Sequence, residues 1–320
     1  GAGTTVSAGA VLDFSTYALG GASTYETLNI SGSGIKNGGA LLFSGSGNNN
    51  FGAMTIAANT RVINNGAGIV AFRGLITAAN AINFGIGGTG PVSIIGVYGA
   101  TATTATITKR DAGTATISAV SITTGLVRIN GGTFKYGIAD ALATPAVTVA
   151  GGTWDLGGYS EGGTTLIGAV TLIDGSIVNT GGAATITSSA AYTVEKGTIS
   201  AVLAGAAITM NKNTAGTVTL SAANTFAGLT SINAGTLAWG INDALSSGNL
   251  TVTGGIADLG TRTDTVGTVT LTSGEITSSS GVLTGTSYAM QSGTVSGILG
   301  GSIALAKTTA GTLIMTCNST

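Results

Sequence analysis

The side chains that could carry out catalysis are few in this chain and lie far apart. Its 320 residues include no histidine, which removes Ser-His-Asp and Cys-His nucleophilic catalysis and most transition-metal sites. Asp155 and Asp258 occupy matching places in two similar stretches, so they are the clearest acidic pair. Five stacked β-rungs at ~4.8 Å each would hold these carboxylates roughly 24 Å apart, whereas an inverting glycosidase needs them within about 10 Å. We therefore predict no catalytic, cofactor-binding or metal-binding residue, and we expect that the chain is not an enzyme.

Three short motifs resemble binding sites without matching them. Lys109, Arg110 and Asp111 are the densest group of charges, and we interpret them as a solvated corner with a local ion pair. Residues 151–155 lack the third glycine of the calcium-binding nonapeptide Gly-Gly-x-Gly-x-Asp. Residues 85–90 weakly resemble a phosphate-binding loop, but no helical pattern follows them. The sequence therefore predicts neither a calcium site nor a nucleotide site.

Large aromatic residues fall on the same apolar phase as the other predicted core positions. They are Phe134, Trp154, Tyr192, Trp239 and Tyr288. We predict that they form a ladder of aromatic side chains inside the fold. The alternative is a carbohydrate-stacking strip, which would require these rings to lie on the outside.

The elements that must position these residues are indicated by regularly spaced glycines. Successive glycines of one set lie 18 to 23 residues apart. The set is Gly113, Gly132, Gly152, Gly175, Gly197, Gly216, Gly235, Gly255, Gly274, Gly293 and Gly311. An apolar residue stands two positions after every one of them, and threonine is frequent directly after. Such alternation predicts short strands with one buried face, the glycine lying at the corner between two strands. We therefore predict an all-β right-handed parallel β-helix (β-solenoid) with about 19–23 residues per rung.

A longer repeat of about five rungs lies over the shorter one. The motif Lys-x-x-Ala-Gly-Thr begins at Lys109, Lys212 and Lys307, which are 103 and 95 residues apart. We assign irregular rungs to residues 1–108, a first five-rung repeat to residues 109–211, a second to residues 212–306 and the start of a third to residues 307–320. No linker or shift in composition separates these parts, so we predict one continuous solenoid domain.

The segment 214–240 resembles the autotransporter-associated β-strand repeat. That family has a Gly-Thr-Leu-x-Leu-Ser strand, an Asn-Thr-Tyr-x-Gly turn and a second Gly-Thr-Leu strand. Here Phe226 replaces the tyrosine of the turn, and Gly228 closes the turn. The resemblance implies a right-handed parallel β-helix in large bacterial surface or secreted proteins, often adhesins or matrix components. The family carries no catalytic residue that could be transferred to this chain.

The ends of the chain and its one cysteine add little chemistry. Cys317 cannot form a disulfide within the chain, and it falls where Ala222 stands in the preceding repeat. We predict a small core or corner residue, with a crosslink between chains as the alternative. Residue 1 is glycine and the sequence shows no signal peptide, so we expect a mature or excised piece of a longer protein.

The composition favours an extracellular structural role. Charged residues make up 7% of the chain and the net charge is −1, so nothing favours binding to nucleic acid. The mean hydropathy is +0.49, yet no uninterrupted apolar run of about 18 residues is present, so we expect no membrane insertion. We expect an extracellular or cell-surface location. We also expect self-association end to end or laterally, or continuation in a longer chain, and surface glycans are the remaining candidate partner.

Three functions compete on this evidence. The first is a structural or adhesive element of a bacterial surface, filament or sheath, without catalysis. The second is a glycan- or ice-binding module that uses a flat face rich in Thr and Ser, with pairs such as Thr217/Thr219 and Thr268/Thr270. The third is a polysaccharide-active β-helix enzyme, which the missing acidic cluster disfavours.

Overall fold

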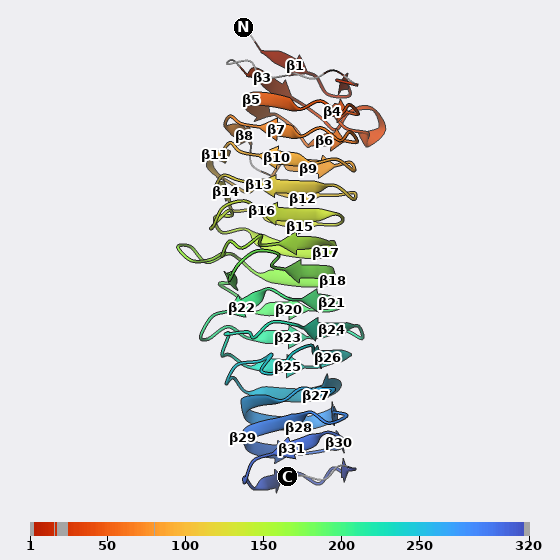
Figure 1. The fold of residues 1–320 in the computed structure, drawn as a ribbon, viewed down its shortest axis with the longest axis vertical. Coiled ribbons are helices and arrows are strands. Elements are labelled where there is room, and N and C mark those ends of the chain that lie inside the picture. Colours follow the sequence, from red (N-terminus) through yellow and green to blue (C-terminus); the bar gives the residue numbers. More distant parts are fainter. Residues whose placement is uncertain (1–2, 16, 18–24, 80, 317–320) are drawn as a thin grey trace. The chain divides into compact units, whose positions relative to one another are not determined.

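The computed structural model describes residues 3–15, 17, 25–79 and 81–316, and it divides into two compact units. The first unit comprises Gly1–Gly168 with Asn179–Ala184, and the second comprises Ala169–Val178 with Thr185–Thr320. In each unit the strands lie one above another as successive rungs (Figure 1). Cys317 and residues 318–320 lie outside the described residues, so the prediction for Cys317 stays open.

The first unit holds β1 to β17 and one short 3-10 turn, η1 (Ile35–Asn37). The strands are β1 (Thr4–Val6), β2 (Leu12–Asp13), β3 (Glu26–Ile30), β4 (Leu41–Phe43), β5 (Asn49–Ile56), β6 (Thr60–Asn64), β7 (Val70–Phe72), β8 (Ile76–Ala78), β9 (Asn83–Gly87), β10 (Val92–Ile94), β11 (Tyr98–Thr103), β12 (Thr106–Lys109), β13 (Thr114–Ile117), β14 (Ser121–Thr123), β15 (Leu126–Ile129), β16 (Thr133–Tyr136) and β17 (Ala146–Asp155).

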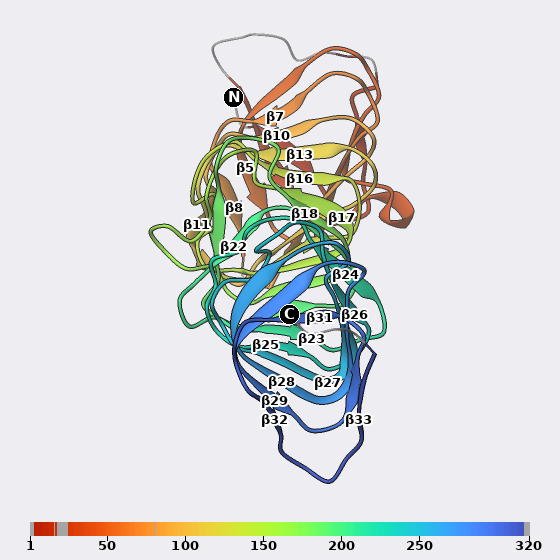
Figure 2. The same ribbon diagram turned by 60° about the horizontal axis from the view of Figure 1, so that its bottom comes forward.

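The second unit holds β18 to β33. The strands are β18 (Val170–Val178), β19 (Thr185–Thr187), β20 (Tyr192–Val194), β21 (Gly197–Ile199), β22 (Val202–Ala204), β23 (Met210–Lys212), β24 (Thr217–Leu220), β25 (Thr230–Ile232), β26 (Thr236–Trp239), β27 (Leu250–Asp258), β28 (Asp264–Thr277), β29 (Val282–Met290), β30 (Gly293–Val295), β31 (Ile298–Gly300), β32 (Leu305–Lys307) and β33 (Leu313–Met315). In Figure 2, β24 lies beside β26 along one face of this unit, and β25 lies beside β27 on another.

The strands pair in parallel with those one turn later, as a solenoid requires. In the first unit β7 pairs with β10, and β10 pairs with β13, so that Val70, Val92 and Ala115 form one column. The fold is therefore an all-β parallel β-solenoid of about 15 turns, which confirms the predicted fold class. The described residues contain no α-helix, and their short 3-10 turn η1 is too short to cross a membrane.

The glycine ladder predicted most of the register between rungs. Ala115, Phe134 and Trp154 form one buried column in the first unit. The corresponding column of the second unit is Val218, Leu237, Ala257, Ile276 and Val295, and all five are buried. Two rungs differ from the prediction, because Ile199 pairs with Leu220 and Val295 pairs with Met315. Both shifts are by two residues, which keeps the same side chains on the inner face of the strand.

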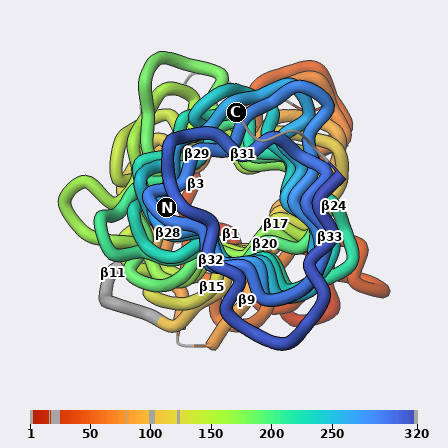
Figure 3. Tube along the Cα trace, turned by 90° about the horizontal axis from the view of Figure 1, so that it is seen from below, coloured from red at the N-terminus to blue at the C-terminus, as the bar shows by residue number. Residues whose placement is uncertain are grey.

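The interior of each unit is filled by these inward columns. Figure 3 shows the turns of the second unit, in cyan and blue, following one another around a common interior. The predicted aromatic residues are all inside: Phe134, Trp154 and Tyr192 are 0% exposed, Tyr288 is 3% exposed and Trp239 is 5% exposed. The first unit adds a ladder of its own, in which the rings of Phe51 and Phe72 lie 5.6 Å apart. The prediction that these aromatic residues lie inside the fold is thus confirmed, and their rings form no external sugar-stacking strip.

Candidate functional site

The lysines that open the first and second long repeats, Lys109 and Lys212, are buried, whereas Lys307 is exposed. This corrects the interpretation of residues 109–111 as a solvated corner. Lys109 is 1% exposed and stands in an inward column between Ile86 and Ile129. Its Nζ donates hydrogen bonds to the carbonyl oxygens of Arg110 (2.5 Å), Asp111 (2.8 Å) and Gly131 (3.2 Å). The aliphatic part of the side chain packs among the apolar side chains of the column, and the ammonium group donates hydrogen bonds to carbonyl oxygens at the corner. Only Arg110 and Asp111 lie at the surface as expected.

The same arrangement recurs in the second unit at Lys212. This lysine is 0% exposed and pairs across the rungs with Val194 and Ile232. Its Nζ donates to the carbonyl oxygens of Thr214 and, at 3.1 Å, Ala234. We call this arrangement the lysine corner, meaning Lys109 or Lys212 with the carbonyls that it binds. Its recurrence after 103 residues shows that the long sequence repeat is also a repeat of side-chain contacts.

A glycine with positive φ completes each lysine corner. Gly132 has φ +58° and Gly235 has φ +65°, a region that L-residues rarely adopt. A Cβ at Gly132 would stand 2.3 Å from the carbonyl oxygens of Asp111 and Gly113 and 2.6 Å from Lys109 Nζ. The predicted role of the glycine ladder at strand corners is therefore confirmed at these two positions, where the lysine also excludes a side chain.

The lysine corner has the electrostatics of a structural element. Burial lowers the pKa of Lys109 to about 8, although the charge of Asp111 opposes the shift. Burial also lowers the pKa of Lys212, with Glu195 opposing. An amine of lowered pKa can act as a nucleophile. Here, however, carbonyl oxygens surround each Nζ and the side chains are inaccessible to a substrate. We therefore assign these lysines a structural role at the corner between strands.

The carboxylate of Asp111 makes a long-range ion pair, where the sequence predicted a local one. Its Oδ2 lies 2.7 Å from Nη2 of Arg61, fifty residues earlier. Although burial acts in the opposite direction, the N–H of Gly88 and the Arg61 guanidinium lower the pKa of Asp111. The pair therefore connects two rungs of the first unit, and no carboxylate of the described residues forms an ion pair with Arg110.

Each long repeat also contains a buried carboxyl group that the sequence motifs did not reveal. Glu161 is 0% exposed and its Oε2 accepts the N–H of Leu142 at 3.2 Å. In the second unit Asp264 is 2% exposed, and its Oδ2 accepts the N–H of Leu245 (2.9 Å) and Nε1 of Trp239 (2.5 Å). Glu161 and Asp264 are 103 residues apart, as are the two leucines, so the long repeat contained the signal.

Burial dominates the titration of both carboxyl groups. It raises the pKa of Glu161 to about 7, against the opposing effects of Tyr136 and the Leu142 N–H. It also raises the pKa of Asp264, against the Leu245 N–H and Trp239. The Tyr136 hydroxyl lies near enough to Glu161 to lower its pKa, but its geometry makes no hydrogen bond, so this hydroxyl and Oε1 of Glu161 have no hydrogen-bond partner among the described residues. The negative charge of Asp140 acts on Glu161 in the same direction as burial, and that of Asp243 does so on Asp264.

We expect Glu161 to make the first unit more stable in mild acid than at pH 8. Its folded-state pKa of about 7 lies above its ordinary value of 4.5, so the folded state binds the proton more tightly. The stabilisation is complete below pH 4.5 and is lost as pH rises through 7, which amounts to about 2.5 kcal/mol between pH 5 and 8. In a Trp239→Phe background, urea unfolding followed by Trp154 fluorescence should show this slope with Glu161 present and not in Glu161→Gln. Parallel pH profiles for the two proteins would contradict the assignment.

The two aspartates singled out by the sequence make local turn contacts. Oδ1 of Asp155 accepts the N–H of Gly157 at 2.9 Å, and Oδ1 of Asp258 accepts the N–H of Gly260 at 2.9 Å. Asp155 also accepts hydrogen bonds from Thr180 and lies 3.2 Å from Nζ of Lys135. Although burial acts in the opposite direction, these bonds lower the pKa of Asp155. Among the described residues no group of three His, Cys, Asp or Glu side chains could hold a metal ion.

The threonines that follow the ladder glycines are at least partly exposed, but they do not form a continuous hydroxyl array. In the second unit Thr217 and Thr236 stand in one outward column, which continues with Ile256 and Glu275. The neighbouring column passes from Thr219 through Ala238 to Asp258 and Thr277. An isoleucine and two carboxylates thus interrupt the flat face on which a two-threonine array would depend.

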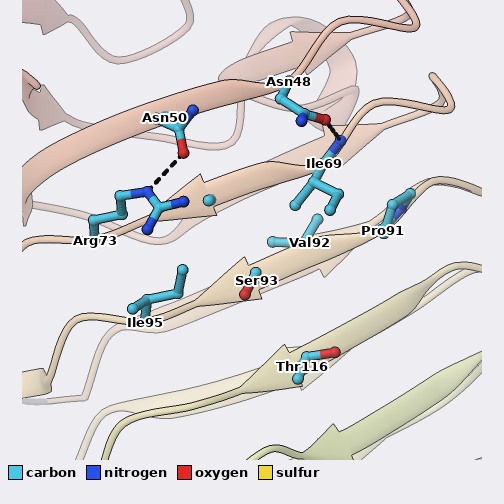
Figure 4. A pocket seen from close by; sticks show the side chains of 10 residues that line it. Asn48, Asn50, Ile69, Arg73, Pro91, Val92, Ser93, Ile95 and Thr116 are labelled. Atoms are coloured by element: carbon cyan, nitrogen blue, oxygen red, sulfur yellow. Dashed lines mark hydrogen bonds between the residues drawn. The ribbon is translucent and has the colours of Figure 1, made fainter. Parts of the chain in front are cut away.

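The outer face of the first unit carries a shallow groove of about 260 Å³ (Figure 4). It crosses β5, β7, β10 and β13, and its floor is partly aliphatic, with Ile69 44% exposed. At its edge Nε of Arg73 donates to Oδ1 of Asn50 at 2.7 Å, and the guanidinium lies 5.8 Å from the centre of the Tyr25 ring. The groove is a surface feature of a stacked sheet, and it contains no acid–base pair.

Two segments of the chain, residues 107–135 and residues 210–238, match one family model. The model is the passenger-associated-transport-repeat. Each match contains one lysine corner, from Lys109 to Gly132 and from Lys212 to Gly235. Comparison of the chain with curated proteins and with solved structures finds no significant match. The repeat is that of autotransporter passengers, which confirms the resemblance, and together with the β-solenoid it fits a passenger-like β-helix of the bacterial surface or of secreted material.

Proposed function

We propose that the chain is a structural or adhesive scaffold presented outside the bacterial cell, and that it has no catalytic role. The observation that carries the proposal is the coincidence of the two passenger-repeat matches with the two lysine corners. The segments that define the repeat thus hold rung corners together, with their polar groups buried and satisfied. Contacts of this kind keep the rungs stacked, whichever side chains occupy the outer faces.

The outer surface supports the same proposal. Eleven basic and twelve acidic residues in 320 leave the faces of the strands mostly to Thr, Ser, Asn and Gly. Neutral polar side chains can approach another surface with few charges to desolvate. Lateral or end-to-end self-association is therefore part of the proposal, and sedimentation at rising concentration tests it. A chain that stays monomeric at every concentration would contradict this part alone.

Immunogold electron microscopy of the native cells tests the proposed location. Antibodies raised against the purified chain should place gold on the outer face of intact cells or on material that extends from it. The same antibodies absorbed with the chain beforehand provide the control for specificity. Gold that appears only inside sectioned or permeabilised cells would contradict the proposal.

A further inference from the structure

A polar cleft of about 310 Å³ opens on the surface of the first unit, away from the groove at Asn50 and Arg73. It runs from η1 across the starts of β6 and β9 to the end of β12. Its lining combines two guanidinium groups and three amides, from Arg61, Arg110, Asn37, Asn59 and Asn83. No carboxylate is among the residues that line it.

The hollow is produced by a glycine in the middle of a column of residues. Arg61, Gly85 and Thr108 follow one another in the parallel register of β6, β9 and β12. Because Gly85 has no side chain, the middle rung leaves a gap between the side chains above and below. A Cβ at Gly85 would lie 3.3 Å from Cγ of Arg61 and would begin to fill that gap.

The cleft contains more hydrogen-bond donors than the protein uses. Nη1 of Arg61 donates to the carbonyl oxygen of Asn37 at 3.2 Å, and Nη2 binds Asp111. Arg110, by contrast, is exposed, and its guanidinium has no hydrogen-bond partner among the described residues. Oδ1 of Asn59 accepts the backbone N–H of Asn83 at 2.8 Å, which orients the amide of Asn59 so that no described residue accepts a hydrogen bond from its NH₂ group.

The wall at η1 is held in an unfavourable conformation. Lys36 has φ 50° and Asn37 has φ 60°, which non-glycine residues rarely adopt. The hydroxyl of Ser33 donates to Oδ1 of Asn37 at 2.5 Å and fixes this residue beside Arg61. Backbone strain of this kind concentrates at ligand-binding sites, where the surrounding contacts keep it in place.

We propose that this cleft binds an acidic polysaccharide, with a sugar carboxylate on Arg110 and sugar hydroxyl groups on Asn59 and Asn83. Asp111 neutralises Arg61, so the uncompensated charge of the cleft is that of Arg110. A guanidinium pairs with a carboxylate through two parallel hydrogen bonds, and amides bind hydroxyls as donor and acceptor. The chain as a whole has a net charge of −1, so its overall charge does not attract polyanions and the affinity must arise in the cleft. The proposal rests on the surface role proposed above, because it gives that role a ligand class.

Titration calorimetry of the purified chain with oligogalacturonate, and with neutral dextran oligomers of equal length, tests the proposal. We expect binding of oligogalacturonate alone, weakened by salt. Arg110→Gln should lower the affinity at least about tenfold, because a hydrogen-bonded charge pair is lost. Arg128→Gln is the matched control, since Arg128 is an exposed arginine on the neighbouring rung that does not line the cleft.

A second variant separates the cleft from the charge. Gly85→Thr fills the hollow without changing any charge, and unchanged circular dichroism would show that β9 still forms. We expect this variant to lose oligogalacturonate binding as well. Equal binding of dextran, or equal losses in Arg110→Gln and Arg128→Gln, would overturn the proposal. Absence of any binding would overturn it too, whereas gold on the surface of intact cells would still support the surface role.

Discussion

Replacement of Lys212 by methionine is expected to lower the stability of the second unit by about 2–4 kcal/mol. Methionine keeps the apolar stem in the column between Val194 and Ile232, so the change removes chiefly the ammonium group. The carbonyl oxygens of Thr214 and Ala234 then lose their charged donor, and each buried carbonyl without a partner costs about 1–3 kcal/mol. The two tryptophans of the chain, Trp154 and Trp239, lie one in each unit, so urea unfolding followed by Trp239 fluorescence in a Trp154→Phe background reports on this unit.

Lys196 provides the matched control for this prediction. Its Nζ lies 2.9 Å from Asp174, but the two side chains are 62% and 49% exposed. An exposed pair of this kind contributes about 0–1 kcal/mol, so Lys196→Met should leave the midpoint almost unchanged. If Lys212→Met behaved like Lys196→Met, desolvation of the ammonium would offset everything that its hydrogen bonds contribute, and the lysine corner would not be a stabilising element.

Replacement of Gly235 by alanine should be still more damaging, at about 4 kcal/mol or more. The new Cβ would lie 2.3 Å from the Thr214 carbonyl oxygen, 2.4 Å from the Gly216 carbonyl oxygen and 2.6 Å from Lys212 Nζ. The two carbonyl oxygens and the buried ammonium cannot all move away from the new Cβ. The backbone at the corner must therefore shift, and the hydrogen bonds of Lys212 or those between the rungs are lost. Losses of this size are exceptional for a single substitution, and here they have a named steric cause.

Gly260→Ala separates the steric effect from the cost of the backbone conformation. Gly260 has φ +54°, close to the value at Gly235, but a Cβ added to it would meet no atom within 4 Å. The alanine there should cost only about 1–2 kcal/mol, the usual penalty for a left-handed L-residue. Equal losses at the two glycines, measured by the same Trp239 unfolding experiment, would show that the lysine corner imposes no constraint of its own.

The rung architecture could be predicted from the sequence because it rests on a local and repeated signal. An apolar residue two positions after each ladder glycine fixes which face of the strand is buried, and the glycine fixes where the chain turns. The two rungs whose register differs, at Leu220 and Met315, illustrate the limit of this signal. A shift of two residues changes no side chain from one face to the other, so alternation alone cannot detect it.

The lysine corner and the buried carboxyl groups could not be predicted from residue type. A charged residue next to other charges is normally solvated, and residue type alone therefore places Lys109 in solvent. Its aliphatic stem nevertheless fits an inward column, and its ammonium finds carbonyls. Glu161 and Asp264 differ in type, so a search for identical residues passes over them. The cleft at Arg110 could not be predicted from the sequence for another reason: its residues lie on different rungs and share no sequence motif.

Surface labelling of intact native cells with a membrane-impermeant amine reagent tests the central claim most directly. Lys36 and Lys196 are exposed, whereas Lys109 and Lys212 are buried in their corners. Mass spectrometry of the recovered chain should therefore find Lys36 and Lys196 modified and Lys109 and Lys212 unmodified, without lysis of the cells. A chain labelled only after lysis would contradict the surface role, and equal labelling of all four lysines would contradict the lysine corner.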